Sequence, residues 1–355
     1  MIVDQLGVPI VLAPLAGGPS TPRLAAAVSN AGGFGFLAAG YLSADQLGEQ
    51  ISQVRELTSA PFGVNVFVPG SPAASLDAVA EYAAALAADA RAVGVELGSA
   101  RFDDDQWEAK LALLTADPPT VASFTFGCPD PAVIGALQTA GSEVWVTVTT
   151  PAEATLAAAA GADTLVAQGS EAGGHRGSFT DDPADDLTGG LGLLSLLQLV
   201  RSRTGLPLIA AGGISSGAAI AAVLAAGAAA AQLGTAFLRC PEAGTSQAQR
   251  DAVATATPTA MTRAFTGRLA RGIRNQFLDD HSHHAPAAYP QVHYLTSPVR
   301  AAGRNAGNLD LINLWAGQTH ELSRELPAAE LITALMSDAR AALQAAASRY
   351  LPPPP

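Results

Sequence analysis

A short pattern recurs along the chain: an alanine-rich stretch ends in Ala-Gly, and a run of strand-forming residues follows it. The four clearest copies have their glycines at Gly32, Gly141, Gly161 and Gly227. Glycine adopts a positive φ without strain, so each of these positions is predicted to end a helix. Helices that alternate with short buried strands are typical of parallel βαβ units. The repeat therefore predicts an α/β fold built around a parallel sheet.

Eight segments are predicted to be strands: residues 10–13, 34–38, 63–67, 120–124, 143–148, 164–167, 207–210 and 230–233. Eight βα units favour a TIM (β/α)8 barrel over an open, doubly wound sheet. In addition, no GxGxxG motif follows the first strand, as a dinucleotide-binding sheet would require. We therefore predict a TIM barrel.

Two stretches do not follow the repeat. Residues 71–110 contain extra helical sequence, and residues 241–298 are long, polar and rich in arginine and histidine. Both come after strand ends, where barrel enzymes build their active sites. We predict a smaller, mostly helical substrate or lid domain from residues 71–101 and 239–299. The barrel with its C-terminal helices would comprise 1–70, 102–238 and 300–351, and residues 352–355 would form a tail.

Composition excludes several classes of protein. The 355-residue chain carries a net charge of −12, whereas binding to nucleic acid needs a basic surface. The uncharged run at 206–238 consists mainly of alanine and glycine and is interrupted by polar residues, so we predict no membrane span. No signal-peptide pattern is visible at the N-terminus. The two cysteines, Cys128 and Cys240, are far apart in sequence, which fits a reducing cytoplasm.

Glycine-rich segments follow the seventh and eighth predicted strands, at residues 211–215 and 232–235. In TIM barrels these two loops commonly bind phosphate, because glycine lets backbone N–H groups approach an anion closely. The alternative is that the glycines only form tight turns. In the context of a barrel, the segments favour a phosphate-bearing cofactor or substrate. Lysine would not be needed, and Lys110 is the only lysine in the chain.

Three polar residues near strand ends are candidates for chemistry. His175 lies in the glycine-rich segment 168–177 after the sixth strand, a placement that suits proton transfer near neutral pH. The alternative is a loop histidine that hydrogen-bonds a neighbouring carbonyl. Asn65 and Gln168 end the third and sixth strands, where their amides could either bind a heterocycle or cap a turn.

Two polar clusters are weak candidates for metal binding. The histidines at 281, 283 and 284 lack a helical i, i+4 pairing, and such loops are usually solvated. The four aspartates at 181, 182, 185 and 186 surround a proline and are typical of an ordinary acidic loop. No metal site is predicted.

Several of these segments, in this order, closely resemble the nitronate monooxygenases, formerly called 2-nitropropane dioxygenases. The similarity lies in PLAGG at 14–18, STP at 20–22, AVSNAGGFGF at 27–36, GVNVF at 63–67, AGGI at 211–214 and QLGT at 232–235, together with the 168–177 loop. Further segments, FTGR at 265–268, AYP at 288–290 and LWAGQ at 314–318, are similar to the class I branch. The similarity spans about residues 5–335.

The resemblance implies a barrel enzyme that uses FMN and O2 to convert alkyl nitronates, of the propionate 3-nitronate type, into a carbonyl compound and nitrite. His175 would be the active-site histidine. The residues expected to contact the flavin ring or ribityl chain are Asn65, Gln168 and Gly173. Those expected to hold its phosphate are Gly213, Gln232, Leu233, Gly234 and Thr235. Tyr289 and His293 would line the substrate pocket.

One departure from the family concerns anionic substrates. Ser297 stands where we expect lysine in some members, which leaves Arg300 as a candidate for binding an anion. Two other functions stay open: an NAD(P)H-dependent flavin reductase of the enoyl-acyl-carrier-protein or quinone type, and a flavin-free barrel that binds a sugar or nucleoside phosphate. The motifs at 288–290 and 314–318 favour the monooxygenase. The sequence leaves the oligomeric state open.

Overall fold

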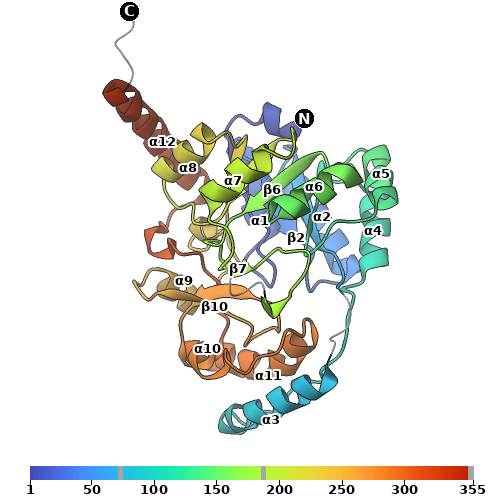
Figure 1. The fold of residues 1–355 in the computed structure, drawn as a ribbon. Coiled ribbons are helices and arrows are strands. Elements are labelled where there is room, and N and C mark those ends of the chain that lie inside the picture. Colours follow the sequence, from blue (N-terminus) through green and yellow to red (C-terminus); the bar gives the residue numbers. More distant parts are fainter. Residues whose placement is uncertain (71–74, 185–188, 351–355) are drawn as a thin grey trace, which may run out of the picture.

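The computed structural model describes residues 1–70, 75–184 and 189–350. The predicted tail at 352–355, together with Asp185 and Asp186, lies outside the described residues. Eight parallel strands form one sheet in the order β1-β9-β8-β6-β5-β4-β3-β2, and helices surround it (Figure 1). The two outer strands meet where Val11 pairs with Phe34, which closes the ring. The chain thus folds as the predicted TIM barrel.

Every predicted barrel strand is confirmed to within one residue at either end. The barrel strands are β1 (Ile10–Leu12), β2 (Gly35–Ala38), β3 (Phe62–Phe67), β4 (Val121–Thr125), β5 (Glu143–Val148), β6 (Thr164–Gln168), β8 (Leu208–Ala211) and β9 (Ala230–Leu233). The surrounding helices are α1 (Pro22–Asn30), α2 (Ala44–Leu57), α4 (Trp107–Ala116), α5 (Pro131–Ala140), α6 (Pro151–Ala160), α7 (Leu193–Arg201), α8 (Gly217–Ala225) and α12 (Ala328–Tyr350).

The helix ends follow from local sequence. Gly32, Gly141, Gly161 and Gly227 have φ angles of +84°, +111°, +101° and +92°, as predicted for residues that end helices. The start of α6 is fixed by a capping box, in which the side chains of Thr150 and Glu153 each accept a hydrogen bond from the other residue's backbone N–H. These signals set where each strand begins.

The side chains that point into the barrel differ between its two ends. At the amino ends, Trp145 is fully buried, with its ring 5.4 Å from that of Phe34 and 5.6 Å from that of Phe36. A Cβ at Gly63 would lie 2.3 Å from the Phe36 ring, so only glycine fits there. Two residues further along β5, the inward side chain is the polar Thr147. The interior therefore changes from apolar to polar towards the carboxyl ends of the strands.

A second unit covers that end of the barrel. It contains α3 (Leu76–Ala92), α9 (Gln247–Val253), α10 (Gln276–His281) and α11 (Gln291–Ala306). These helices agree with the prediction of a smaller, mostly helical unit. It also contains an antiparallel sheet in the order β10-β11-β7, formed by Thr259–Thr262, Ala270–Ile273 and Gly174–His175. Because β7 belongs to the loop that follows β6, this sheet ties the unit directly to the barrel.

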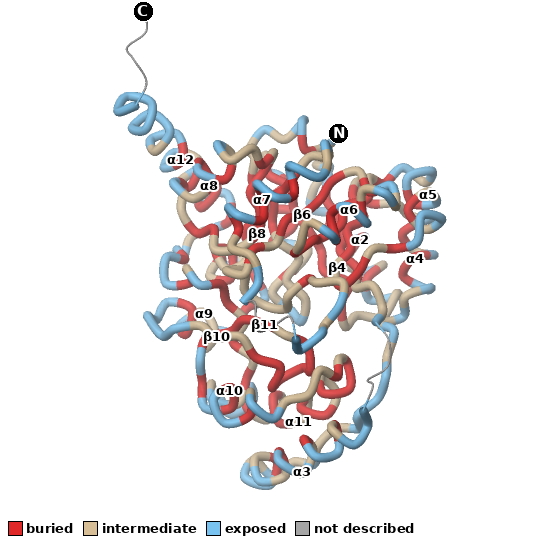
Figure 2. Tube along the Cα trace, viewed as in Figure 1, coloured by how far each residue is buried: buried red, intermediate tan, exposed pale blue. Residues whose placement is uncertain are grey.

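The two predicted lid segments share a hydrophobic core. Tyr82 and Leu86 of α3 pack with Phe265, Val292 and Leu295, and this core is separate from the larger one around the barrel. The expected boundary between residues 299 and 300 falls inside α11, so the division into domains stays a prediction. Helix α12 packs on α8 and then extends away from the barrel, where its last turns are exposed (Figures 1 and 2). None of the described helices is long and apolar enough to cross a membrane.

Candidate active site

A pocket lies at the carboxyl ends of the barrel strands, between the barrel and the second unit. Its volume is about 1160 Å³, including its open mouth. Eight of the predicted site residues line it together: Asn65, Gln168, Gly173, His175, Gly213, Gln232, Gly234 and Thr235. Leu233 is the last residue of β9, and its side chain is buried in the core around the barrel. Tyr289 and His293 are not among the lining residues, although Tyr289 borders His175.

The floor of the pocket is a polar belt. Asn65 is buried and donates from Nδ2 to the hydroxyls of Ser123 and Thr125, at 2.9 and 3.1 Å. Thr125 lies 3.4 Å from the hydroxyl of Thr147 on the next strand. Among the described residues, nothing donates to the amide oxygen of Asn65. The belt therefore fixes the side chain of Asn65 and leaves one acceptor for a ligand.

The ends of β8 and β9 form a cradle of backbone groups. Gly212 and Gly213 have φ angles of +120° and +65°, a conformation that glycine adopts without strain. No hydrogen bond from the N–H of Gly213, Gly234 or Thr235 to another part of the described chain is present. Convergent free N–H groups of this kind suit an anion such as phosphate.

The C-terminal segment completes this cradle. The hydroxyl of Thr235 accepts from the Gly317 N–H at 2.9 Å, and Thr319 donates to the Gly213 carbonyl at 3.0 Å. Gly317 and Thr319 both line the pocket. Sequence reasoning did not select these two as site residues, although the motif at 314–318 was the signal that could have found Gly317.

A dense set of hydrogen bonds holds the loop that carries His175. Gln168 donates to the carbonyl of His175 at 3.1 Å and accepts from the Gly177 N–H at 2.8 Å. Arg176 donates to the Gln168 carbonyl at 2.8 Å, and Arg271 donates to the Ser170 carbonyl at 3.1 Å. The side-chain amide of Gln168 is thus used at both ends to shape the loop that presents the histidine.

The ring of His175 lies against aromatic side chains and near two cations. Its centroid is 5.4 Å from Trp315 and 5.7 Å from Tyr289, and its Nε2 lies 2.8 Å from the hydroxyl of Thr266. Burial, reinforced by the positive charges of Arg268 and Arg300, lowers the pKa of His175 to about 3. The imidazole is therefore neutral at physiological pH and carries a free lone pair on one nitrogen.

Tyr289 and His293 form a wall beside His175, with Tyr41 from the loop after β2. The Tyr41 and His293 rings stack with centroids 4.3 Å apart, and the Tyr289 hydroxyl donates to that of Tyr41 at 3.3 Å. Arg300 donates to the His293 carbonyl at 2.7 Å. Burial lowers the pKa of Arg300 to about 10. Its guanidinium also bonds Thr296 and Asn313, so its donors are directed to neutral protein groups.

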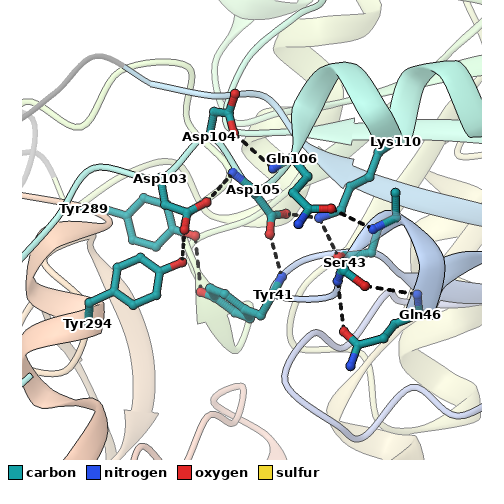
Figure 3. A network of polar contacts seen from close by, with 12 residues as sticks. Tyr41, Ser43, Gln46, Asp103, Asp104, Asp105, Gln106, Lys110, Tyr289 and Tyr294 are labelled. Atoms are coloured by element: carbon teal, nitrogen blue, oxygen red, sulfur yellow. Dashed lines mark hydrogen bonds and ion pairs between the residues drawn. The ribbon is translucent and has the colours of Figure 1, made fainter.

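The only lysine of the chain anchors this wall from behind. Lys110 is fully buried, lies 2.7 Å from Asp105 and donates to the Ala39 carbonyl at 2.9 Å. Asp105 in turn accepts from the Tyr41 N–H at 2.9 Å, where Tyr41 has a φ of +69° (Figure 3). Burial lowers the pKa of Lys110 and raises that of Asp105. The pair thus holds Tyr41 in an unusual backbone conformation.

One residue from each of the two weak metal candidates has another partner in the structure. His281 lies 3.1 Å from Asp89 of α3, and Asp181 forms an ion pair of 2.8 Å with Arg263. Within the described ranges, no three His, Cys, Asp or Glu residues gather as a metal ion would need.

Comparison with known proteins places this architecture among characterised enzymes. The sequence pattern of the nitronate monooxygenase family matches residues 2–338. A nitronate monooxygenase from Pseudomonas aeruginosa is 42% identical over 346 residues, covering 94% of this chain and 96% of the relative. The structure of a nitroalkane oxidase from Streptomyces ansochromogenes matches with a TM-score of 0.94 and 51% identity, over 97% of this chain and 99% of that one. FabK from Thermotoga maritima matches with a TM-score of 0.75 and 26% identity, over 98% of both chains.

Proposed function

The chain belongs to the nitronate monooxygenase family, and on that premise we propose that it oxidises alkyl nitronates with bound FMN and O2, giving a carbonyl compound and nitrite. The observation that carries this proposal is one pocket that joins a glycine cradle, a polar belt and a neutral histidine. We extend the substrates to neutral nitroalkanes, since the similar Streptomyces protein is a nitroalkane oxidase. Nitronates of the propionate 3-nitronate type remain the substrates suggested by the resemblance.

The charges around the pocket suit an anionic substrate. Arg268 and Arg300 are both buried, and the hydrogen bonds that their guanidinium groups form within the described chain go to neutral groups, with no ion pair to a carboxylate. Their positive charges lower the pKa of His175, and the same field attracts a nitronate, whose charge is negative. Arg300 would act through this field, because its donors already bind Thr296, His293 and Asn313.

The pocket residues fit FMN. The free N–H groups of Gly213, Gly234 and Thr235 would hold the phosphate, together with the end of β9 at Gln232 and Leu233. Asn65 would accept from the ring system, and Gln168 and Gly173 would border the ring or ribityl chain. When bound, the flavin would supply the redox chemistry by taking an electron from the nitronate. The chain itself would position both partners and hold the proton acceptor, His175.

The cradle can be tested by replacing Gly234 with aspartate. A Cβ at this position would lie 3.2 Å from Leu15 and 3.3 Å from Ala13, and the carboxylate would add negative charge beside the phosphate. Gly234→Asp is expected to raise the Kd for FMN about tenfold or more, which corresponds to about 1.4 kcal/mol of lost binding free energy, so that less FMN remains bound after purification.

The matched control is Gly205→Asp, which adds the same charge at an exposed position before β8, at the opposite end of the barrel. This variant should keep the wild-type ratio of flavin to protein, measured from the visible spectrum. An unchanged ratio in Gly234→Asp would place the phosphate elsewhere. A colourless wild-type protein would favour the flavin-free phosphate binder.

Anaerobic reduction tests the function against the flavin reductase alternative. The purified holoenzyme is mixed with an alkyl nitronate or with NADPH in the absence of O2, and the visible flavin absorbance is followed. We expect rapid bleaching by the nitronate and little by NADPH. Rapid bleaching by NADPH with none by the nitronate would instead assign the chain to the reductases.

A further inference from the structure

The hydroxyl of Thr266 is the only described side-chain partner of the His175 ring nitrogens. Thr266 is 1% exposed and lies in the turn between β10 and β11, and its Oγ1 is 2.8 Å from His175 Nε2. The other ring nitrogen, Nδ1, has no partner among the described residues. It is not among the fully buried unpartnered atoms, and the His175 side chain lines the pocket. Only one nitrogen of the ring is therefore held by the protein.

The hydrogen bonds around Thr266 favour one tautomer of His175. A threonine hydroxyl has one proton, and the Thr266 oxygen also lies 3.3 Å from the Arg268 carbonyl, which can only accept. Within the described chain, no other group donates to that carbonyl. If Thr266 donated to His175 instead, a buried carbonyl would be left without a donor, which is unfavourable.

We propose that Thr266 is a positioning residue that donates to the Arg268 carbonyl, accepts from His175 Nε2–H and so leaves Nδ1 as the free lone pair facing the substrate. All three groups are then paired. The opposite tautomer would present an N–H to the pocket and could not take a proton. The structure thus assigns Thr266 the task of making His175 a base rather than a donor.

This arrangement has a defined chemical consequence, which rests on the proposed function. With a neutral nitroalkane, the C–H bond next to the nitro group breaks and its proton forms the new Nδ1–H bond. The electron pair moves into the C–N bond and the charge resides on the nitro oxygens, giving the nitronate. A preformed nitronate needs no such step. The ratio of kcat/KM for nitroalkane over nitronate therefore reports on Thr266.

The tautomer can be measured without turnover, by ¹⁵N NMR on the holoenzyme labelled at histidine. The His175 signals are identified by their loss in His175→Asn. We expect a protonated, pyrrole-type Nε2 and an unprotonated, pyridine-type Nδ1. A protonated Nδ1 in the wild-type enzyme would overturn the proposal, whether or not the protein oxidises nitronates.

Two variants of Thr266 complete the test. Thr266→Val keeps the shape but removes the acceptor, so the tautomers should mix and the nitroalkane-to-nitronate ratio of kcat/KM should fall about tenfold or more. Thr266→Ser keeps the hydroxyl and should restore both the tautomer and the ratio. A valine variant with bound flavin, an unchanged tautomer and an unchanged ratio would also overturn the proposal. If the wild-type protein did not oxidise nitronates, the proposed function would be refuted, but the assignment of the His175 tautomer to Thr266 would not.

Discussion

Replacing His175 with asparagine is expected to lower kcat/KM for a neutral nitroalkane by about tenfold or more, because a base whose pKa lies near 3 contributes less than one whose pKa lies near the working pH. Turnover of a preformed nitronate should fall much less, because its α-proton has already left. The measurement is steady-state kinetics on both forms of one substrate, with the nitronate prepared in base and used before it reprotonates. Equal losses on both forms would give His175 a binding or electrostatic role instead.

The pH dependence of kcat/KM in the wild-type enzyme tests the protonation state of His175. Burial and two cations lower the pKa of His175 to about 3, so the base stays unprotonated from pH 8 down to pH 5. We expect no decrease in kcat/KM for the nitroalkane from this group over that range. A histidine with its ordinary pKa near 6.5 would lose about 30-fold by pH 5. His284→Asn, at an exposed position of the second unit, is the matched control for His175→Asn.

Replacing Lys110 with methionine is expected to lower the free energy of unfolding by about 3–5 kcal/mol. The substitution fills the space but leaves the Asp105 carboxylate without its cation and the Ala39 carbonyl without its donor. Urea denaturation of the holoenzyme, with the midpoint and slope both fitted, measures the loss. A loss below about 1 kcal/mol would mean that solvent screens the pair as it does on a surface.

Two controls separate the buried charge from the lost packing. In Lys110→Met combined with Asp105→Asn, no charge is stranded and an acceptor for the Tyr41 N–H is kept, so most of the lost stability should return. Arg55→Met removes an ion pair with Asp117 in which both side chains are about 40% exposed or more, and should cost less than about 1 kcal/mol.

The barrel and the shape of its pocket could be predicted because they depend on local signals. Glycines at helix ends and short buried strands recur with every βα unit, and the loops after β6, β8 and β9 follow directly from that order. Once the barrel is accepted, the glycine segments and His175 must meet at one end, because parallel strands place their carboxyl ends together. This is why eight predicted site residues line one pocket.

The second sheet and the supports of the site were not predictable in the same way. Strand β7 is a Gly-His pair, and β11 reads Ala-Arg-Gly-Ile, so neither shows the alternation or β-branched content that marks a strand. Their pairing comes from tertiary contact. Thr266 and Tyr41 were missed for a related reason: each meets its partner across a long sequence separation, and a single sequence contains no trace of that contact.

The sequence shows that Lys110 is the only lysine, but it does not show that this lysine is buried. Its rarity was evident from composition, yet its position suggested nothing, since a lone lysine in a helix is usually solvated. In the structure it is fully buried against Asp105, which comes just before α4 and adopts a positive φ. A buried ion pair therefore supports Tyr41, which belongs to the wall beside His175.

Oxygen uptake tests the proposed activity most directly. The flavin-loaded protein is placed in air-saturated buffer with an alkyl nitronate and without NAD(P)H, and O2 consumption and nitrite are followed together. We expect saturable O2 uptake that begins on addition of the nitronate and is accompanied by nitrite and a carbonyl product. No uptake with the nitronate, combined with O2 consumption that starts only when NADPH is added, would contradict the proposed activity.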